Sequence, residues 1–257
     1  METAYSFLSL EDDGVVARIV LRRPPLNVLH LEMVRELNRV LRDLRADDGL
    51  RVLVISAEGK AFSAGVAIED HLPERVGTMI PAFHDVFRHL RTLCIPTIAA
   101  VQGAALGGGC ELACFADFVI ASENASFGLP EVKLASFPPV AAVHFPHRIG
   151  FARTLQLVLS GDVLPAHEAK RIGLVDTVVP GEKLAETVEA EVGKLREKSG
   201  PALRLAKRAV WQAAGYGFES RLRKAEELFL GELMKTADAT EGLTAFLAKR
   251  APSWAHR

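Results

Sequence analysis

The chain has 257 residues, of which 49% are hydrophobic and 25% are charged, enough to bury one large core or two modest ones. This composition excludes intrinsic disorder as the main state of the chain. The 31 lysines and arginines nearly balance the 32 aspartates and glutamates, giving a net charge of −1, so the overall charge favours neither nucleic acid nor an anionic membrane as a partner.

The cysteines and the N-terminal residues predict a cytoplasmic protein. Cys94, Cys110 and Cys114 lie in apolar sequence without C-x-x-C spacing, which is typical of buried thiols in a reducing compartment. The N-terminal segment lacks a basic region followed by an apolar stretch and a cleavage site, so it predicts no secretion or membrane insertion. The uncharged run 92–110 contains a proline, a glutamine and four glycines, which favours a strand, a turn and a buried helix over a membrane span.

Strand and helix patterns alternate through the first part of the chain. Alternating apolar residues predict a strand over 15–21, ended by Pro24 and Pro25. Apolar residues three and four apart predict a helix over 31–46. Further elements are expected as a strand at 51–56, a helix at 79–93, a strand at 96–101, a helix from Leu106 and a strand at 118–121. This rhythm predicts an α/β fold.

Beyond about Gly181 only helical patterns follow. Pro201 opens one helix, residues 220–235 form another, and Asp238 with Glu241 resembles a capping box before the last helix.

The change of pattern predicts a boundary near residue 195, between a core of residues 1–195 and a helical region of residues 196–257. No linker or low-complexity tract separates the two parts. We therefore expect the helical region to pack on its own core or on a neighbouring subunit.

Two glycine-containing turns, 61–68 and 103–113, stand where a predicted strand gives way to a helix. Glycine lets the backbone approach a ligand, and the first N–H groups of a helix are unpaired donors, so two such turns facing each other can hold an oxyanion. The alternative is that small residues only permit tight packing. No Gly-Lys-Ser/Thr and no G-x-G-x-x-G after a first strand is present, which argues against a nucleotide site.

Two acidic residues stand close to these turns. Glu111 lies in apolar sequence, where a carboxylate is costly unless it has a partner or a function, and Glu131 follows a turn. Two carboxylates in one pocket suit the addition of water, because one takes a proton from water and the other delivers a proton to carbon. Each acid alone is more often structural or exposed.

Five motifs together resemble the crotonase (enoyl-CoA hydratase/isomerase) superfamily. They span almost the whole chain and occupy residues 62–65, 106–113, 116–121, 127–131 and 241–250. The resemblance implies a spiral of strand-strand-helix turns, C-terminal helices that make trimers or dimers of trimers, and an acyl-CoA thioester as substrate. It implies no metal and no redox cofactor, coenzyme A being part of the substrate.

The resemblance also assigns the site. The backbone N–H groups of Val66 and Gly108 would form the oxyanion hole for the thioester carbonyl. Glu111 would deprotonate the water and Glu131 would deliver the proton to the α-carbon, the two titrating as a coupled pair.

The same resemblance places coenzyme A against three residues of the first turn, Ala64, Val66 and Ile68. Phe229 and Lys249 match positions that contact its nucleotide end, sometimes from a neighbouring subunit. For Phe229 the alternative is simple helix packing, because Leu222, Ala225 and Leu233 share its face.

The sequence departs from the family pattern at two places. Ala67 replaces the acid that usually follows the first turn, although Glu69 and Asp70 stand nearby, and residues 137–146 replace a glycine-rich stretch. The aromatic and alkyl side chains of that segment argue for an apolar acyl pocket fitting a flat or ring-shaped group. We expect it to be lined by Phe137, Pro138 and Val140. Residues 137–142, together with 62–66 and 69–71, resemble cyclohexa-1,5-diene-1-carbonyl-CoA hydratases, and a plain enoyl-CoA hydratase is the equal alternative.

Several other functions stay open at this stage. A double-bond isomerase, a thioester hydrolase or a decarboxylase would use the same oxyanion hole. A non-catalytic CoA-binding or RNA-binding member of the superfamily is the alternative from another class, which both glutamates and the lack of a basic stripe argue against. The histidines form no zinc-type pair with a neighbouring acid, so we expect no metal site.

Overall fold

The computed structural model describes residues 5–213 and 217–255 and has an α/β fold, as the sequence predicts. Six strands form the main sheet in the order β1-β2-β3-β4-β6-β9, with β1 antiparallel to β2 and the remaining pairs parallel. A second sheet has the order β5-β7-β8. The strands are β1 Leu8–Asp12, β2 Val16–Leu21, β3 Val52–Ala57, β4 Thr97–Val101, β5 Ala104–Leu106, β6 Phe118–Ser122, β7 Ser126–Gly128, β8 Val163–Pro165 and β9 Thr177–Val179.

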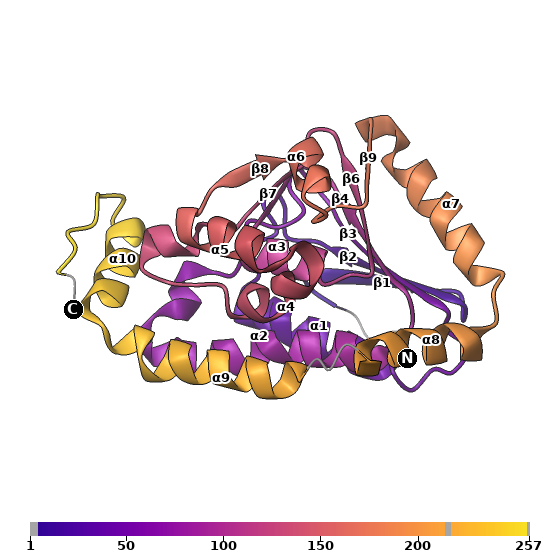
Figure 1. Ribbon diagram of the computed structural model, residues 1–257, viewed down its shortest axis with the longest axis horizontal. Helices are drawn as coiled ribbons and strands as arrows, with labels where there is room; N and C mark the ends of the chain where they lie inside the picture. The colour runs from indigo at the N-terminus through magenta and orange to yellow at the C-terminus, as the bar shows by residue number, and fades with distance from the viewer. Residues whose placement is uncertain (1–4, 214–216, 256–257) are drawn as a thin grey trace.

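Helices follow most of these strands and then fill the C-terminal region (Figure 1). The α-helices are α1 Leu31–Leu44, α2 Pro73–Leu93, α3 Gly108–Cys114, α4 Pro139–Ile149, α5 Phe151–Ser160, α6 Ala166–Arg171, α7 Leu184–Arg196, α8 Gly200–Ala213, α9 Phe218–Gly231 and α10 Ala237–Leu247. Short 3-10 turns are η1 Ile68–His71, η2 Pro130–Leu134, η3 Gly181–Lys183 and η4 Leu233–Lys235. Among the described residues, no helix is both long and apolar enough to cross a membrane.

Successive apolar side chains of the parallel strands point to alternate faces of the main sheet, so the core is divided between the two faces. On β3, Leu53 and Ile55 pack into the large cluster that contains α1 and α2, whereas Val52 and Val54 pack into a smaller cluster with α7. Because successive side chains of a strand point to opposite faces, both faces of these strands are buried, as parallel sheets require. Figure 1 shows α7 outside the sheet, away from α1 and α2.

Several helix boundaries differ from those predicted, and the largest differences are in α2, α3 and α9. Helix α2 begins at Pro73, six residues before the predicted start, because a proline is accepted in the first turn. Helix α3 begins at Gly108 because Ala104–Leu106 pair with β7 as a strand. Helix α9 ends at Gly231 rather than at residue 235.

The predicted capping box at Asp238 is wrong. Thr236 is the N-cap residue of α10, and its hydroxyl accepts the N–H of Ala239 at 3.1 Å. Asp238 instead lies in the first turn of the helix, where a negative charge is also favourable.

The C-terminal helices pack on the core of their own chain. Helix α9 runs along the lower edge of Figure 1 and contacts α2 and α4. Glu226 of α9 accepts a hydrogen bond from the fully buried His84 of α2 at 2.6 Å and forms an ion pair with Arg88 at 2.9 Å. These charged contacts fix α9 over α2. The domain boundary near residue 195 stays a prediction.

Candidate active site

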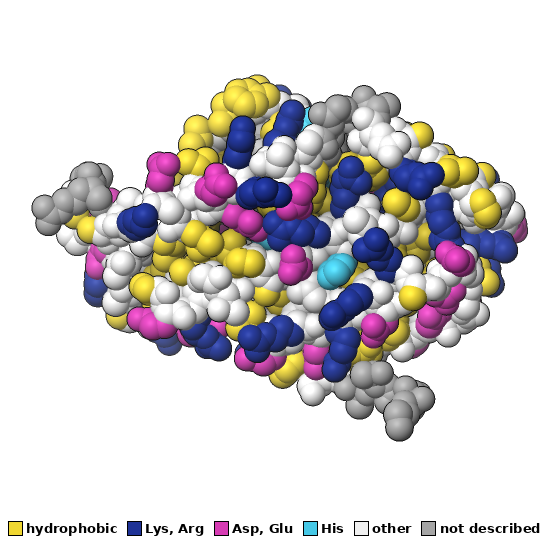
Figure 2. Space-filling model, turned by 90° about the horizontal axis from the view of Figure 1, so that it is seen from below, with side chains coloured by type: hydrophobic (Ala, Val, Ile, Leu, Met, Phe, Trp, Pro, Cys, Tyr) yellow, Lys and Arg dark blue, Asp and Glu magenta, His cyan; other side chains and the backbone are white. Residues whose placement is uncertain are grey.

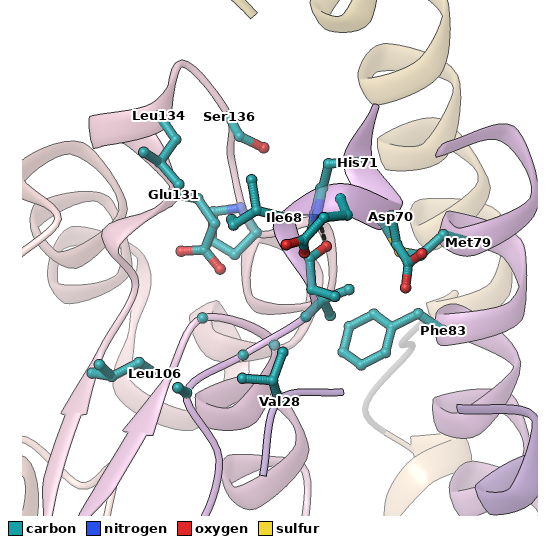
Figure 3. Close-up of a pocket in the computed structure, with 18 of the residues that line it drawn as sticks. Val28, Ile68, Asp70, His71, Met79, Phe83, Leu106, Glu131, Leu134 and Ser136 are labelled. Atoms are coloured by element: carbon teal, nitrogen blue, oxygen red, sulfur yellow. Dashed lines mark hydrogen bonds between the residues drawn. The ribbon is translucent and has the colours of Figure 1, made fainter. Parts of the chain in front are cut away.

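A cavity of about 950 Å³ lies where the predicted turns, the start of α3, the segment before α4 and helix α9 meet. Figure 3 shows side chains from these separate segments converging on it. The cavity is lined by most of the residues that the sequence singles out, Ala64, Val66, Ile68, Gly108, Glu111, Glu131, Phe137, Pro138 and Phe229.

The first turn is held by hydrogen bonds to neighbouring backbone. Ser63, which is fully buried, donates its hydroxyl to the carbonyl of Asn27 at 2.8 Å and accepts the N–H of Gly65 at 3.1 Å. The carbonyl of Ser63 accepts the N–H of Leu106 at 2.9 Å, which joins the first turn to the second. Gly65 has φ +103°, and a Cβ there would lie 2.9 Å from the carbonyl oxygen of Leu106. The turn therefore requires glycine.

Two backbone donors stand unpaired where the turns meet. Within the part of the chain that the structure describes, the N–H groups of Val66 and Gly108 donate no hydrogen bond, and both residues line the cavity. They pack tightly together, because a Cβ on Gly108 would lie 2.7 Å from Cγ2 of Val66. Gly108 also opens α3, where the first N–H groups have no partner within the helix. Such a pair can receive an oxygen that gains negative charge.

Glu111 is buried at 2% exposure and its carboxylate meets the start of helix α4. The N–H of Ala141 donates to Oε1 at 2.8 Å, and the N–H of Val140 also bonds the carboxylate. Pro138 and Pro139, which come just before, have no N–H to offer. Burial raises the pKa of Glu111, and these two donors oppose the rise because they stabilise the charged form.

Glu131 has a different environment. Its Oε2 is buried and has no hydrogen-bond partner among the described residues, and its Oε1 lies 2.8 Å from where a Cβ on Gly107 would be. Burial raises the pKa of Glu131, and the negative charge of Glu111 raises it further. Both pKa values are raised, that of Glu131 more than that of Glu111, so Glu111 is the first of the pair to lose its proton.

Aromatic side chains close the opposite part of the cavity. The rings of Phe137 and Phe229 meet edge to face with centroids 5.2 Å apart, and His71 lies 6.4 Å from Phe229. Phe229 is thus packed in a helix face and also lines the cavity. Val140 differs from the expectation for the acyl pocket: its side chain is fully buried outside the cavity, and Pro139 lines the cavity instead.

The residues expected to contact coenzyme A divide in two. Ala64, Val66 and Ile68 line the cavity. Lys249 is exposed after the end of α10 and is not among the lining residues. Phe229 lines the cavity. The contacts of Phe229 and Lys249 with the nucleotide end of coenzyme A stay predictions.

Two residues of η1 were not assigned a role from sequence. Asp70, 2% exposed, accepts the N–H of Leu31 at 2.8 Å and pairs with Arg75 at 3.1 Å, so it caps the start of α1. The acid missing at Ala67 thus has a counterpart three residues later. His71 enters the cavity beside Phe229. The sequence signal for Asp70 is an acid close to the place where the family pattern is broken, and that for His71 is its place in the segment 69–71, which resembles the dienoyl-CoA hydratases.

A family model described as enoyl-CoA hydratase/isomerase matches residues 11–257. The chain belongs to this family. It is 34% identical over 253 residues to cyclohexa-1,5-dienecarbonyl-CoA hydratase of Thauera aromatica, which covers 96% of each chain. It is 37% identical over 257 residues to a probable enoyl-CoA hydratase of Rhizobium meliloti, covering 99% of this chain and 100% of that one.

Solved structures of the family have the same fold. An enoyl-CoA hydratase of Mycobacterium avium subsp. paratuberculosis superposes with a TM-score of 0.88 at 28% identity, covering 98% of this chain and 99% of that one. The resemblance to the crotonase superfamily and the fold class are confirmed. Among the described residues, no group of three or more histidine, cysteine, aspartate or glutamate side chains is placed so that it could hold a metal ion.

Proposed function

We propose that this protein is a hydro-lyase that adds water to an α,β-unsaturated acyl-CoA thioester. The observation that carries the proposal is that the buried Glu111 and the buried Oε2 of Glu131 lie in one cavity with two unpaired backbone N–H groups. This combination supplies a base, an acid and an oxyanion site. The hydratase names of the similar proteins support the same reaction.

The carbonyl oxygen of the thioester would accept hydrogen bonds from the backbone N–H groups of Val66 and Gly108. As a nucleophile attacks the β-carbon, electrons move to this oxygen and an enolate forms. A single donor of this kind is typically worth about 3 kcal/mol of the barrier. Because both donors belong to the main chain, their contribution to lowering the barrier depends on the position of the turns and not on the identity of the Val66 side chain.

The two glutamates would divide the proton transfers. Glu111, the favoured carboxylate, takes a proton from water while the water oxygen bonds to the β-carbon. Glu131, the favoured neutral acid, gives its proton to the α-carbon as the enolate collapses. One proton is taken and one is given, so a proton passing from Glu111 to Glu131 or exchange with solvent restores the starting state.

The substrate is proposed to be flat or cyclic. Phe137 and Phe229 form an apolar edge-to-face pair on the wall of the cavity, which suits a ring better than a flexible chain. The relative from Thauera aromatica is named for a cyclic dienoyl-CoA. The proposed substrate class is therefore a cyclic dienoyl-CoA, with straight-chain enoyl-CoA as the alternative.

Coenzyme A would be bound as part of the substrate at the Ala64–Ile68 turn, and the proposed chemistry needs no other cofactor. We also propose a homotrimer or a dimer of trimers. Phe151 and Leu159 of α5 are 69% and 67% exposed, which is typical of an apolar surface covered by another subunit. The three free thiols support a cytoplasmic location.

A nucleic-acid partner is disfavoured by the surface charge. Over the described residues on the face shown in Figure 2, basic and acidic side chains are intermingled rather than separated. Binding to RNA usually requires a basic patch.

The test is incubation with crotonyl-CoA and, separately, with cyclohexa-1,5-diene-1-carbonyl-CoA, followed by mass spectrometry. Gain of one water by the cyclic diene supports both the reaction and the substrate class, and rapid gain only by crotonyl-CoA supports a general hydratase. Gain by neither thioester contradicts the proposal and favours an isomerase, a hydrolase or a decarboxylase. Tight CoA binding without turnover of any thioester would favour a non-catalytic subunit.

Glu111→Gln separates hydration from isomerisation. Its amide cannot deprotonate water, so hydration is expected to fall by at least about 100-fold, whereas movement of a double bond, which needs no water, is spared. A full rate of hydration in this variant would show that the two-carboxylate mechanism is wrong.

A further inference from the structure

A polar ring stands on the aromatic wall of the cavity. His71 belongs to η1 and lines the cavity beside Phe229, whose ring centroid is 6.4 Å away. Phe83 and Phe137 line the same cavity. Apolar substrates gain nothing from a histidine at such a position, so its polar atoms need a separate explanation.

The hydrogen bond of His71 fixes which nitrogen can serve a ligand. Its Nδ1 lies 2.9 Å from the carbonyl oxygen of Ala67. A carbonyl only accepts, so Nδ1 carries a hydrogen. Burial lowers the pKa of His71, which favours the neutral ring. Its Nε2 is then an acceptor with a lone pair, and it has no hydrogen-bond partner within the described part of the chain.

Ser136 supplies a complementary donor to the same cavity. Its Oγ is buried and has no partner among the described residues, whereas its N–H is fixed by donation to the carbonyl of Glu131 at 3.0 Å. Buried hydroxyls in native proteins are nearly always hydrogen-bonded, so an unpaired one at a cavity indicates a missing ligand or water. In Figure 3 the Ser136 hydroxyl points toward the side of the cavity on which His71 lies.

We propose that His71 and Ser136 select an acyl group that carries a hydroxyl. A hydroxyl can donate to Nε2 of His71 and accept from Oγ of Ser136 at once, which satisfies both atoms. This inference rests on the proposed function and adds to it a substrate class, the hydroxylated acyl thioester. The amide of the pantetheine arm has the same donor and acceptor chemistry. His71 follows the Ala64–Ile68 turn at which coenzyme A is proposed to bind, so the two ligands are separated by comparing thioesters that differ only in a hydroxyl of the acyl group.

Calorimetric titration with two saturated thioesters tests the inference without turnover. The protein is titrated with hexanoyl-CoA and with 5-hydroxyhexanoyl-CoA, which differ only in the hydroxyl. We expect the wild-type protein to bind the hydroxylated thioester about tenfold more tightly, the effect of one well-formed buried hydrogen bond. His71→Phe and Ser136→Ala are expected to lose most of this preference, and His71→Gln to keep part of it because its amide oxygen accepts.

His167→Phe is the matched control, since His167 is exposed and lies outside the cavity. Its preference must equal that of the wild type. Thermal melting of each variant shows whether it folds, and if His71→Phe does not, His71→Gln and Ser136→Ala carry the test.

Three results would overturn the inference. The first is equal affinity of the wild-type protein for both thioesters. The second is an equal loss of affinity for both thioesters in the variants, which assigns His71 and Ser136 to the pantetheine amide. The third is an unchanged preference in the variants. Hydration of crotonyl-CoA and of cyclohexa-1,5-diene-1-carbonyl-CoA by the same wild-type sample tests the proposed function separately, because selective binding without hydration of either thioester would contradict only that function.

Discussion

The two sides of the cavity are built from different parts of the chain. One side, the backbone floor, consists of residues 64–68 and 106–108, and its candidate donors are main-chain N–H groups. The other side, the side-chain wall, consists of His71, Phe137 and Phe229. Floor geometry depends on the glycines and hydrogen bonds that hold the turns. Wall geometry depends on side chains that can be exchanged one at a time, so the floor suits a fixed chemistry and the wall a variable specificity.

Gly108→Ala should cause the largest loss, because the added Cβ would lie 2.7 Å from Cγ2 of Val66 and 2.8 Å from Cζ of Phe83. Movement of the floor would displace both donors, and we expect kcat/KM for hydration to fall by about 100-fold. Val66→Ala keeps the backbone and should stay within about threefold of the wild type. Steady-state kinetics of the two variants compare them directly. Equal losses would contradict a main-chain oxyanion site.

Phe229→Ala removes one ring of the side-chain wall and leaves the backbone floor unchanged. We expect the free energy of unfolding to fall by about 3 kcal/mol, as for other buried phenylalanines, and KM for the cyclic dienoyl-CoA to rise more than KM for crotonyl-CoA. Leu228→Ala is the control, because the side chain of Leu228, next to Phe229 in the sequence, is 50% exposed. Denaturant unfolding and kinetics with both thioesters test this. Equal changes in the two KM values would show that Phe229 does not shape the acyl site.

Glu131→Gln should stabilise the protein while it removes hydration. In the native state the pKa of Glu131 is raised by burial and by Glu111, so between the unfolded and native pKa values the native state binds more protons than the unfolded state. Stability is then fully present below the unfolded pKa and falls as pH rises through the native pKa. We expect the variant to exceed the wild type by on the order of 2 kcal/mol at pH 9 and by little at pH 4. A pH-independent difference in unfolding free energy would contradict the raised pKa.

Asp70→Ala should have the smallest effect, a loss of about 1 kcal/mol in unfolding free energy, because it removes the cap at Leu31 and the partner of Arg75. Glu69→Ala changes an exposed neighbour and serves as the control. Thermal unfolding measures both. If the two variants melt alike, Asp70 does not hold the first turn against α1.

Local patterns in the sequence predict the strands and helices of the core. They predict less well which residues form the side-chain wall of the cavity. The strands at Val16–Leu21 and Val52–Ala57 follow from apolar runs whose burial the sheet requires. The start of α3 was misplaced because β5 depends on pairing with β7, a contact distant in sequence. The contact of His71 with Phe229 depends likewise on how α9 packs on α2, where Glu226 bonds His84. Such tertiary contacts leave no periodic signal.

The motifs predict the floor better because its residues are close in sequence to glycines with special conformations. Gly65 and Gly107 have positive φ, and each stands next to a predicted donor of the oxyanion site. The bonds from α4 to Glu111 were not predicted, since they join residues thirty positions apart.

The account rests most directly on the unequal protonation of Glu111 and Glu131. A pH titration of the carboxyl carbons by NMR, with 13C-labelled glutamate and the variants Glu111→Gln and Glu131→Gln for assignment, measures it. We predict that at neutral pH one of the two carboxyl groups keeps its proton and that the signal of this acid disappears in Glu131→Gln. Two carboxyl groups that both titrate at the ordinary pKa of glutamate would contradict the division of base and acid on which the proposed hydration depends.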